Sequence, residues 1–136
     1  MADLTTSTKI NESTRDVTYA FQYQYVDGGN ESAVSKIDVS GLAKSANGDT
    51  CSGLRIVEVW WIVKNMTVEV LADASTDIII MHIDENNGYQ DFTSFGGLPD
   101  TSDYGSSGTG DVKFTTTGAG AAGDSYQVVI RGIKQY

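Results

Sequence analysis

The sequence predicts an all-β fold, specifically an antiparallel β-sandwich of jelly-roll type with about eight strands. Three observations predict it: many short segments alternate apolar and polar residues with a period of two, turn-forming residues separate these segments, and no amphipathic helical segment stands out. Strands spaced at roughly 8 to 15 residues with such turns between them are typical of sandwiches and jelly rolls. The expected strands are 16–26, 33–39, 54–64, 66–72, 77–83, 89–95, 111–117 and 125–135.

The clearest strand is 16–26, in which polar residues alternate with an apolar face. This face consists of Val17, Tyr19, Phe21, Tyr23 and Tyr25. The next residues, 27–30, are Asp-Gly-Gly-Asn, which tolerate positive φ and therefore predict a hairpin turn into the second strand.

The longest apolar stretch, 54–64, carries bulky residues on both faces, so we expect this strand to be central or half covered by a neighbouring subunit. Trp60 and Trp61 must point to opposite faces, and at most one can enter the core. The other needs a cover, for which a partner subunit is the obvious candidate. The sequence therefore predicts a subunit interface that includes Trp60 and Ile62, in a homo-oligomer that we expect to be a trimer.

The second half of the chain contains the remaining strands and one long loop. Asn65 breaks the chain between two strands, and residues 96–110, which include the single proline, predict an exposed loop. Its candidate contact residues are Phe95, Leu98, Pro99 and Tyr104. Greek-key pairing of the first and last strands would bring 19–25 near 126–133.

The first fifteen residues are rich in Thr, Ser and Asn and have no apolar alternation, which predicts a flexible N-terminal arm before a single sandwich domain at 16–136. Such an arm could become ordered on another surface. Its candidate contacts are Leu4, Lys9, Ile10 and Arg15.

Composition limits the possible partners. The chain of 136 residues has 9 Lys and Arg against 18 Asp and Glu, a net charge of −9, which repels phosphate backbones and argues against nucleic acid. No apolar run approaches the roughly 20 residues that span a bilayer, and the N-terminus has neither the basic start nor the apolar run of a signal peptide. We therefore expect a soluble protein without a membrane partner.

No motif predicts catalysis. His82 is the single histidine and Cys51 the single cysteine, so a Ser-His or Cys-His pair and a zinc site both lack members. Acidic turns at 84–87 and 100–103 could offer oxygens to calcium, but neither matches a known binding loop, and solvated turns are the better interpretation. We expect no enzyme activity, no cofactor and no metal.

From residue 37 onward, five segments resemble a family of small virion proteins of tailed phages, the capsid decoration or cement proteins. They are Ile-Asp-Val-Ser-Gly-Leu at 37–42, the strand around Trp60 and Trp61, Asp-Phe-Thr-Ser-Phe-Gly-Gly-Leu-Pro at 91–99, and Gly-Asp-Val-Lys-Phe-Thr-Thr at 110–116 with Gly-Asp-Ser-Tyr-Gln-Val-Val-Ile at 123–130. The resemblance implies a β-sandwich that is made in the host cytoplasm and sits on the outer capsid surface as a small oligomer bound to the major capsid protein. It supplies no active-site residues.

A carbohydrate-binding or receptor-binding module, such as a domain of a phage fibre, is the alternative. Aromatic side chains can stack on sugar rings, although their alternate placement within strands favours packing in the core or between subunits.

Overall fold

A computed structural model describes residues 3–136 and confirms the all-β class. Within these residues nine strands form two antiparallel sheets that pack as a sandwich, and the only helical elements are three short 3₁₀ helices. The jelly-roll designation is not confirmed. The strands are β1 (Leu4–Glu12), β2 (Asp16–Gln24), β3 (Val34–Ile37), β4 (Gly53–Lys64), β5 (Thr67–Ala72), β6 (Ile78–Ile83), β7 (Asn87–Asp91), β8 (Val112–Thr117) and β9 (Ser125–Gln135).

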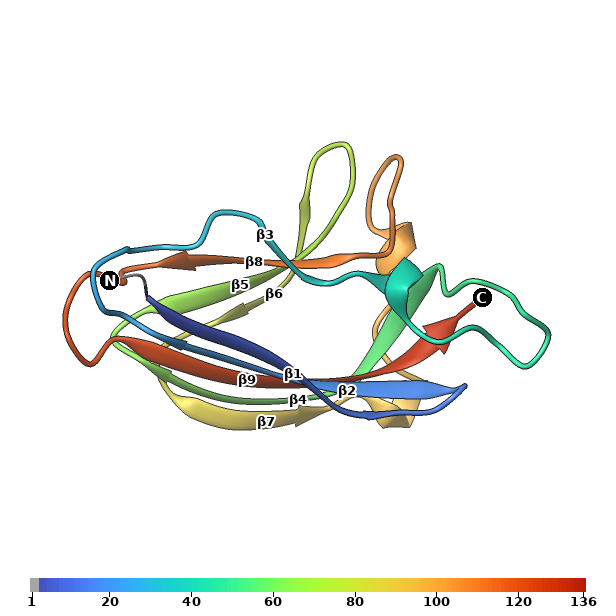
Figure 1. The fold of residues 1–136 in the computed structure, drawn as a ribbon, viewed down its shortest axis with the longest axis horizontal. Helices are drawn as coiled ribbons and strands as arrows, with labels where there is room; N and C mark the ends of the chain where they lie inside the picture. Colours follow the sequence, from blue (N-terminus) through green and yellow to red (C-terminus); the bar gives the residue numbers. More distant parts are fainter. Residues whose placement is uncertain (1–2) are drawn as a thin grey trace.

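The two layers are plain in Figure 1, where β3, β8 and β5 lie above β9, β4 and β7. One sheet has the order β1-β2-β9-β4-β7 and the other the order β3-β8-β5-β6. The last strand therefore lies in the middle of the larger sheet, between β2 and β4. Its register with β2 pairs Tyr19 with Ile130 and Tyr23 with Tyr126, which confirms the expected contact between these two segments.

The chain crosses between the sheets where the sequence predicts a break. β4 belongs to one sheet and β5 to the other, and only Asn65 and Met66 connect them. Asn65 has a φ of 57°, a left-handed conformation that asparagine adopts more readily than most residues. Met66 is buried, so the link also packs on the core.

Aromatic rings join the two sheets at the centre of the sandwich. Phe21 of β2 meets Phe114 of β8 edge to face, with ring centroids 5.1 Å apart. Phe114 also meets Tyr126 of β9 at 5.7 Å, and Tyr23 stacks on Tyr126 at 5.4 Å. Edge-to-face pairs add about 1 kcal/mol each beyond the burial of their area. The inward face of the clearest predicted strand is therefore part of the core.

The flexible arm predicted over residues 1–15 is contradicted for residues 4–12, which form β1. This strand pairs along its length with β2, so the sheet begins at Leu4 and not at residue 16. The first two residues lie outside the described part of the chain. The side chains of β1 bury almost nothing, because they are exposed from Leu4 through Asn11. Its stability must therefore come from backbone hydrogen bonds and from contacts at its two ends.

The first end is held by Asp3. Its carboxylate accepts hydrogen bonds from the backbone N–H groups of four consecutive residues, 26–29, at 2.7 to 2.9 Å, and from the hydroxyl of Tyr23 at 2.8 Å. The backbone donors, Gly29 foremost and then Val26 and Gly28, hold the pKa of Asp3 well below its usual range. The residue that precedes β1 is thereby fixed to the turn that follows β2.

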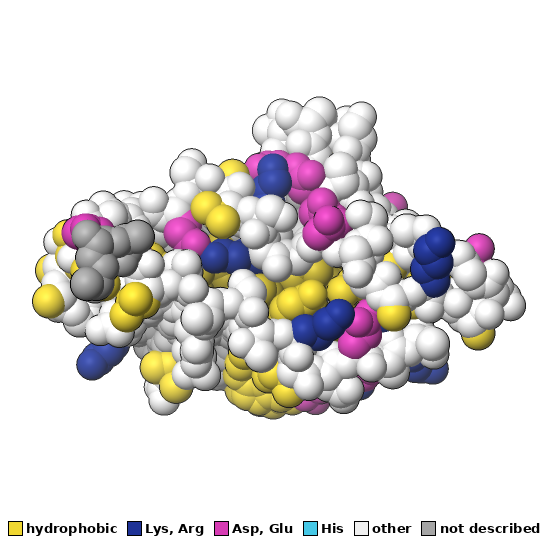
Figure 2. Space-filling model, in the orientation of Figure 1, with side chains coloured by type: hydrophobic (Ala, Val, Ile, Leu, Met, Phe, Trp, Pro, Cys, Tyr) yellow, Lys and Arg dark blue, Asp and Glu magenta, His cyan; other side chains and the backbone are white. Residues whose placement is uncertain are grey.

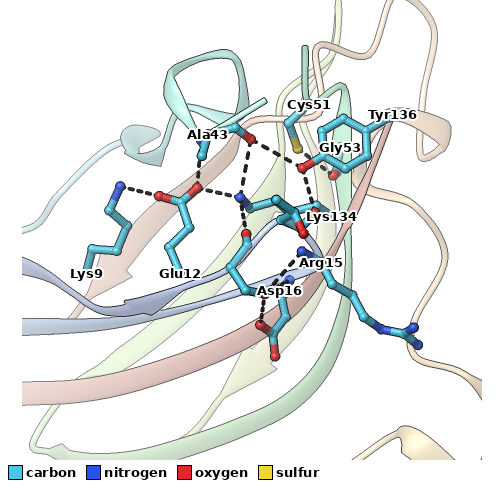
Figure 3. Close-up of polar contacts among 11 residues, drawn as sticks. Lys9, Glu12, Arg15, Asp16, Ala43, Cys51, Gly53, Lys134 and Tyr136 are labelled. Atoms are coloured by element: carbon cyan, nitrogen blue, oxygen red, sulfur yellow. Dashed lines mark hydrogen bonds and ion pairs between the residues drawn. The ribbon is translucent and has the colours of Figure 1, made fainter. Parts of the chain in front are cut away.

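The second end is held by a buried ion pair, drawn in Figure 3. The Lys134 side chain of β9 is fully buried, and its ammonium lies 2.5 Å from a carboxylate oxygen of Glu12 and 2.6 Å from the carbonyl oxygen of Ser13. Glu12 also accepts hydrogen bonds from Lys9 at 2.6 Å and from the backbone N–H of Ala43 at 2.7 Å. One cluster thus connects β1, its turn, the loop after β3 and the last strand.

This cluster sets the charge state of Glu12. Burial alone would raise the pKa of its carboxyl group, but the hydrogen bonds from Lys134, Lys9 and Ala43 outweigh burial and lower the pKa to about 2. A carboxyl group whose pKa is lowered on folding stabilises the folded state at pH values above its unfolded pKa. That contribution is lost as the pH falls toward 2.

We expect Glu12→Gln to lower the free energy of unfolding near neutral pH by about 3 kcal/mol, because it leaves the buried ammonium without its carboxylate. The variant should also lose stability less steeply than the natural protein between about pH 5 and pH 2, since it lacks the carboxylate that must be protonated. Urea denaturation across this range measures both effects. Glu85→Gln, at an exposed turn, is the control. Parallel pH profiles for the natural protein and Glu12→Gln would contradict this account.

Candidate functional site

The outer face of the five-stranded sheet is the candidate site. Strand registers place its outward side chains in rows that cross all or most of the strands. We define three of these rows together as the acid-free face. They are Leu4, Gln24, Ser125 and Lys64; Thr6, Gln22, Gln127, Ile62 and Asn87; and Thr8, Ala20, Val129, Trp60 and Tyr89.

The acid-free face contains no Asp or Glu, although the chain has 18 of them. Carboxylates begin in the next row, where Arg131 Nη1 lies 2.7 Å from Glu58 Oε1. The Tyr89 hydroxyl donates to the other oxygen of Glu58 at 2.6 Å, and this hydrogen bond raises the pKa of Tyr89 to about 12. Glu58 is therefore paired at the border of the face, with Arg131 in its own row and with Tyr89 in the adjoining row of the face.

The apolar end of the face lies over β4 and β7. Trp60 and Tyr89 stack with ring centroids 5.1 Å apart and are 37% and 44% exposed, while Ile62 is 55% exposed. Together with Gln127 and Val129 they line an open hollow of about 400 Å³. Figure 2 shows hydrophobic side chains gathered along this lower side of the molecule. Exposed aromatic and aliphatic groups clustered in this way mark interaction surfaces in soluble proteins.

The other end of the face is polar and uncharged except for Lys64. A second hollow of about 490 Å³ lies over β1, β2, β9 and the end of β4, lined by Gln22, Gln24, Gln127 and Ser125 among others. The Thr6 hydroxyl donates to Gln22 at 3.0 Å, so one amide is already oriented by its neighbour. Both hollows share Ile62 and Gln127, and they form one continuous shallow surface.

Trp61 faces the opposite way from Trp60, as the sequence predicts. It packs against the core, and its indole N–H donates to the side chain of Asn86 at 2.6 Å. The indole lies directly over Gly88 of β7: a Cβ atom at that position would stand 2.6 Å from Trp61 Cζ2. The absence of a side chain at Gly88 therefore lets β7 approach the indole and hold Tyr89 beside Trp60.

The structure places the four arm residues on or beside β1. Leu4 and Ile10 are 54% and 57% exposed, Leu4 on the acid-free face and Ile10 at an irregularity in the pairing with β2. Lys9 is occupied by its ion pair with Glu12. Arg15 lies exposed in the turn after β1, with its carbonyl oxygen bound by the backbone N–H of Lys134 at 2.7 Å. Contact of these residues with a capsid stays a prediction.

The exposed loop predicted at 96–110 is in fact anchored along β4. Arg55 donates to the carbonyl oxygens of Leu98 and Gly97 at 3.1 and 2.9 Å, and the Thr101 hydroxyl, itself buried, donates to Gly110 at 2.6 Å. Phe95 is 61% exposed and Pro99 is exposed, but Leu98 and Tyr104 are half-buried. Only part of this loop is therefore available to a partner, and the expectation of a fully exposed loop is wrong.

The groups considered for chemistry lie apart from one another. Cys51 is buried, its thiol donates to the carbonyl oxygen of Gly53 at 3.2 Å, and burial raises its pKa. His82 is exposed on β6, 3.0 Å from Asp84. Within residues 3–136 no three His, Cys, Asp or Glu side chains gather as metal ligands, and no helix is long and apolar enough to cross a membrane.

Sequence reasoning missed the polar half of the acid-free face and the ion pair of Glu12 with Lys134. The alternation in 16–26 already puts Gln22 and Gln24 on one face, so part of the polar half had a signal. Which strands contribute side chains to this face depends on the strand order of the sheet, and no local pattern links residues 12 and 134.

Comparisons with protein families, with curated proteins and with solved structures find no match to this chain.

We expect Gly88→Ala to destabilise the protein by roughly 1 to 3 kcal/mol, because the added methyl group overlaps the Trp61 indole. Tryptophan fluorescence should change as the indole is displaced, and urea denaturation measures the stability. Gly120→Ala is the matched control, since a Cβ there meets no atom within 4 Å. If both variants keep the natural stability and emission spectrum, the packing of Trp61 over β7 is not as described.

Proposed function

We propose that this chain is a non-enzymatic structural protein of a tailed-phage virion, which decorates and stabilises the outer capsid surface as a small homo-oligomer bound to the major capsid protein. The observation that carries the proposal is the acid-free face, with Trp60, Ile62 and Tyr89 exposed at one end. The resemblance of residues 37–136 to decoration proteins supplies the class of virion protein.

Charge explains why this face suits contact between copies. Two molecules of net charge −9 repel each other wherever their carboxylates approach. A face without carboxylates avoids this repulsion, and its exposed apolar side chains gain free energy when covered, at about 25 cal/mol per Å². We therefore place the subunit interface of the expected trimer at the end of the face that contains Trp60 and Ile62.

The segments that carry the resemblance lie in the scaffold of the fold. Residues 91–99 run from β7 into the loop anchored on β4, 110–116 lead into β8, and 123–130 form the turn and first half of β9. Turn and strand signatures of this kind support a shared architecture, which fits a structural role better than a shared reaction.

We expect the natural protein to have the mass of a small oligomer in light scattering after size-exclusion chromatography, and Ile62→Glu to shift it toward the 14.6 kDa monomer. The added carboxylate would lie in the covered interface, where an unpaired charge is costly. Ile79→Glu is the matched control, because Ile79 is 53% exposed on β6 of the other sheet and should tolerate the change. A natural protein that is monomeric at tens of micromolar would overturn the interface.

The natural protein, Ile62→Glu and Ile79→Glu also test whether this chain decorates capsids. Cosedimentation with capsid shells stripped of their decoration protein should retain the natural protein and Ile79→Glu, and should retain less of Ile62→Glu, because an oligomer binds through several sites at once. Failure of the natural protein to bind such shells, with its oligomer intact, would refute decoration while leaving the interface standing.

A glycan-binding module is the second candidate, favoured by one specific observation. The amide-lined hollow leads directly to the Trp60 and Tyr89 rings, and amides beside an aromatic surface suit a neutral sugar. Binding to a glycan panel by a monomeric natural protein, lost in Gln127→Ala and Trp60→Ala, would support this function over decoration.

A further inference from the structure

One long edge of the larger sheet is left open. β1 pairs with β2 on one side, and among residues 3–136 no strand pairs with its other side. Nine residues long, it is longer than any other edge strand, and its first five residues, 4–8, are Leu-Thr-Thr-Ser-Thr with neither charge nor proline. Natural proteins usually protect such an edge with charges, prolines, bulges or short strands.

The other three edge strands have such protection. β3 has four residues and an irregular register, and β7 has five residues and ends at Asp91. β6 lies between Asp77 and Asp84, so two copies paired there would bring carboxylates together at each end. Residues 4–8 of β1 have none of these features, because charged side chains and an irregularity in the pairing with β2 occur only in its second half, 9–12.

The register identifies the backbone groups at this edge. Tyr25 donates its N–H to the carbonyl oxygen of Asp124, in the segment before β9. The odd-numbered residues of β2 therefore direct their backbone groups toward β9, and its even-numbered residues direct theirs toward β1. Thr6 and its even-numbered neighbours lie opposite these residues and bond toward β2. The N–H and C=O groups of Thr5 and Ser7 therefore point to the open edge.

We propose that β1 strands of two copies of this chain pair antiparallel across this edge, about a twofold axis that passes between their Thr6 residues. Thr5 of each copy then forms a hydrogen-bonded pair with Ser7 of the other, which uses the outward backbone groups of both. The two larger sheets continue into one sheet that extends across the dimer.

Charge favours this register over its neighbours. It brings the negative charge of Asp3 in one copy near the positive charge of Lys9 in the other, although each keeps its partners within its own chain, and residues 4–8 between them are neutral. Moving the axis to Ser7 would lose this pairing of opposite charges. The contacts of Asp3 and Glu12 already hold β1 in its extended conformation in the single copy. Pairing of two copies therefore carries little additional cost in conformational entropy.

This contact is independent of the proposed function, because it uses the edge of the sheet and not the interface at Ile62. It goes beyond that proposal in giving the chain a second, twofold contact. If both contacts form, β1 joins oligomers to one another on a surface where many copies lie side by side.

Cysteine cross-linking tests the pairing. Facing residues of a non-hydrogen-bonded antiparallel pair have Cα atoms about 4.5 Å apart, within the range of a disulfide. Thr6→Cys should therefore give a disulfide-linked dimer under mild oxidation, at least tenfold more than Ile79→Cys, a position on β6 that is also exposed. The natural Cys51 is buried and should not contribute. Equal cross-linking of the two variants would overturn the proposal.

A second pair of variants separates the edge from the acid-free face, where the Thr6 side chain also lies. Proline at position 7 removes an outward N–H and leaves the ladder with β2 intact. Thr6→Cys with Ser7→Pro should lose the cross-link, whereas Thr6→Cys with Ser7→Ala should keep it, both with the natural circular dichroism spectrum. Cross-linking that survives proline in a folded protein would assign the contact to the face and reject the edge.

Discussion

The fold depends on the position of β9 between β2 and β4. This strand pairs along nearly its whole length on both sides, and its even-numbered residues from Tyr126 to Lys134 are all buried. The middle of the larger sheet is therefore completed by the last residues of the chain, and β2 is joined to β4 only through them. Contacts between such distant segments carry a large loop-closure cost, which is recovered only when the strand is in place.

The buried charge at Lys134 is a consequence of this position. At the end of β9, the inward alternation that buries Tyr126, Val128 and Ile130 continues to a lysine, whose ammonium must then find partners inside the protein. Glu12 and the carbonyl oxygen of Ser13 provide them. The same contact that satisfies the lysine also fixes the end of β1, so a strand with no buried side chains becomes part of the sheet.

Local alternation of apolar and polar residues predicts the strands whose side chains pack in the core. It does not predict β1 or the anchoring of the loop at 96–110. Each of the eight expected segments contains a strand or part of one, most clearly where side chains alternate between a buried and an exposed face, as in β2 and β8. The strand expected at 89–95 is wrong in its second half, because β7 ends at Asp91 and Thr93–Phe95 form a 3₁₀ helix. β1 has no such alternation, because neither of its faces is covered, and sequence reasoning therefore misread it as an arm. The loop at 96–110 was misread for a related reason: Arg55 and Thr101 anchor it through backbone carbonyl groups, which leave no pattern in the sequence.

The candidate site was predictable only in part. The opposite orientation of Trp60 and Trp61 follows from strand geometry, and it correctly places one ring outside the core. The polar rows beside Trp60 come from β1, β2 and β9, and their position next to β4 follows from strand order, which a single sequence does not encode locally. A functional surface built across strands is for this reason harder to predict than a motif within one segment.

The acid-free face and the open edge of the larger sheet meet along β1. The side chains of Leu4, Thr6 and Thr8 belong to the acid-free face, and the backbone groups of Thr5 and Ser7 form the open edge. A net charge of −9 describes the molecule as a whole and hides this local neutrality, which extends from the start of β1 across β2 and β9. Since neither surface contributes to the core, the absence of charge there is not required for folding. It is what contact between equally charged copies requires, which gives both proposals the same physical basis.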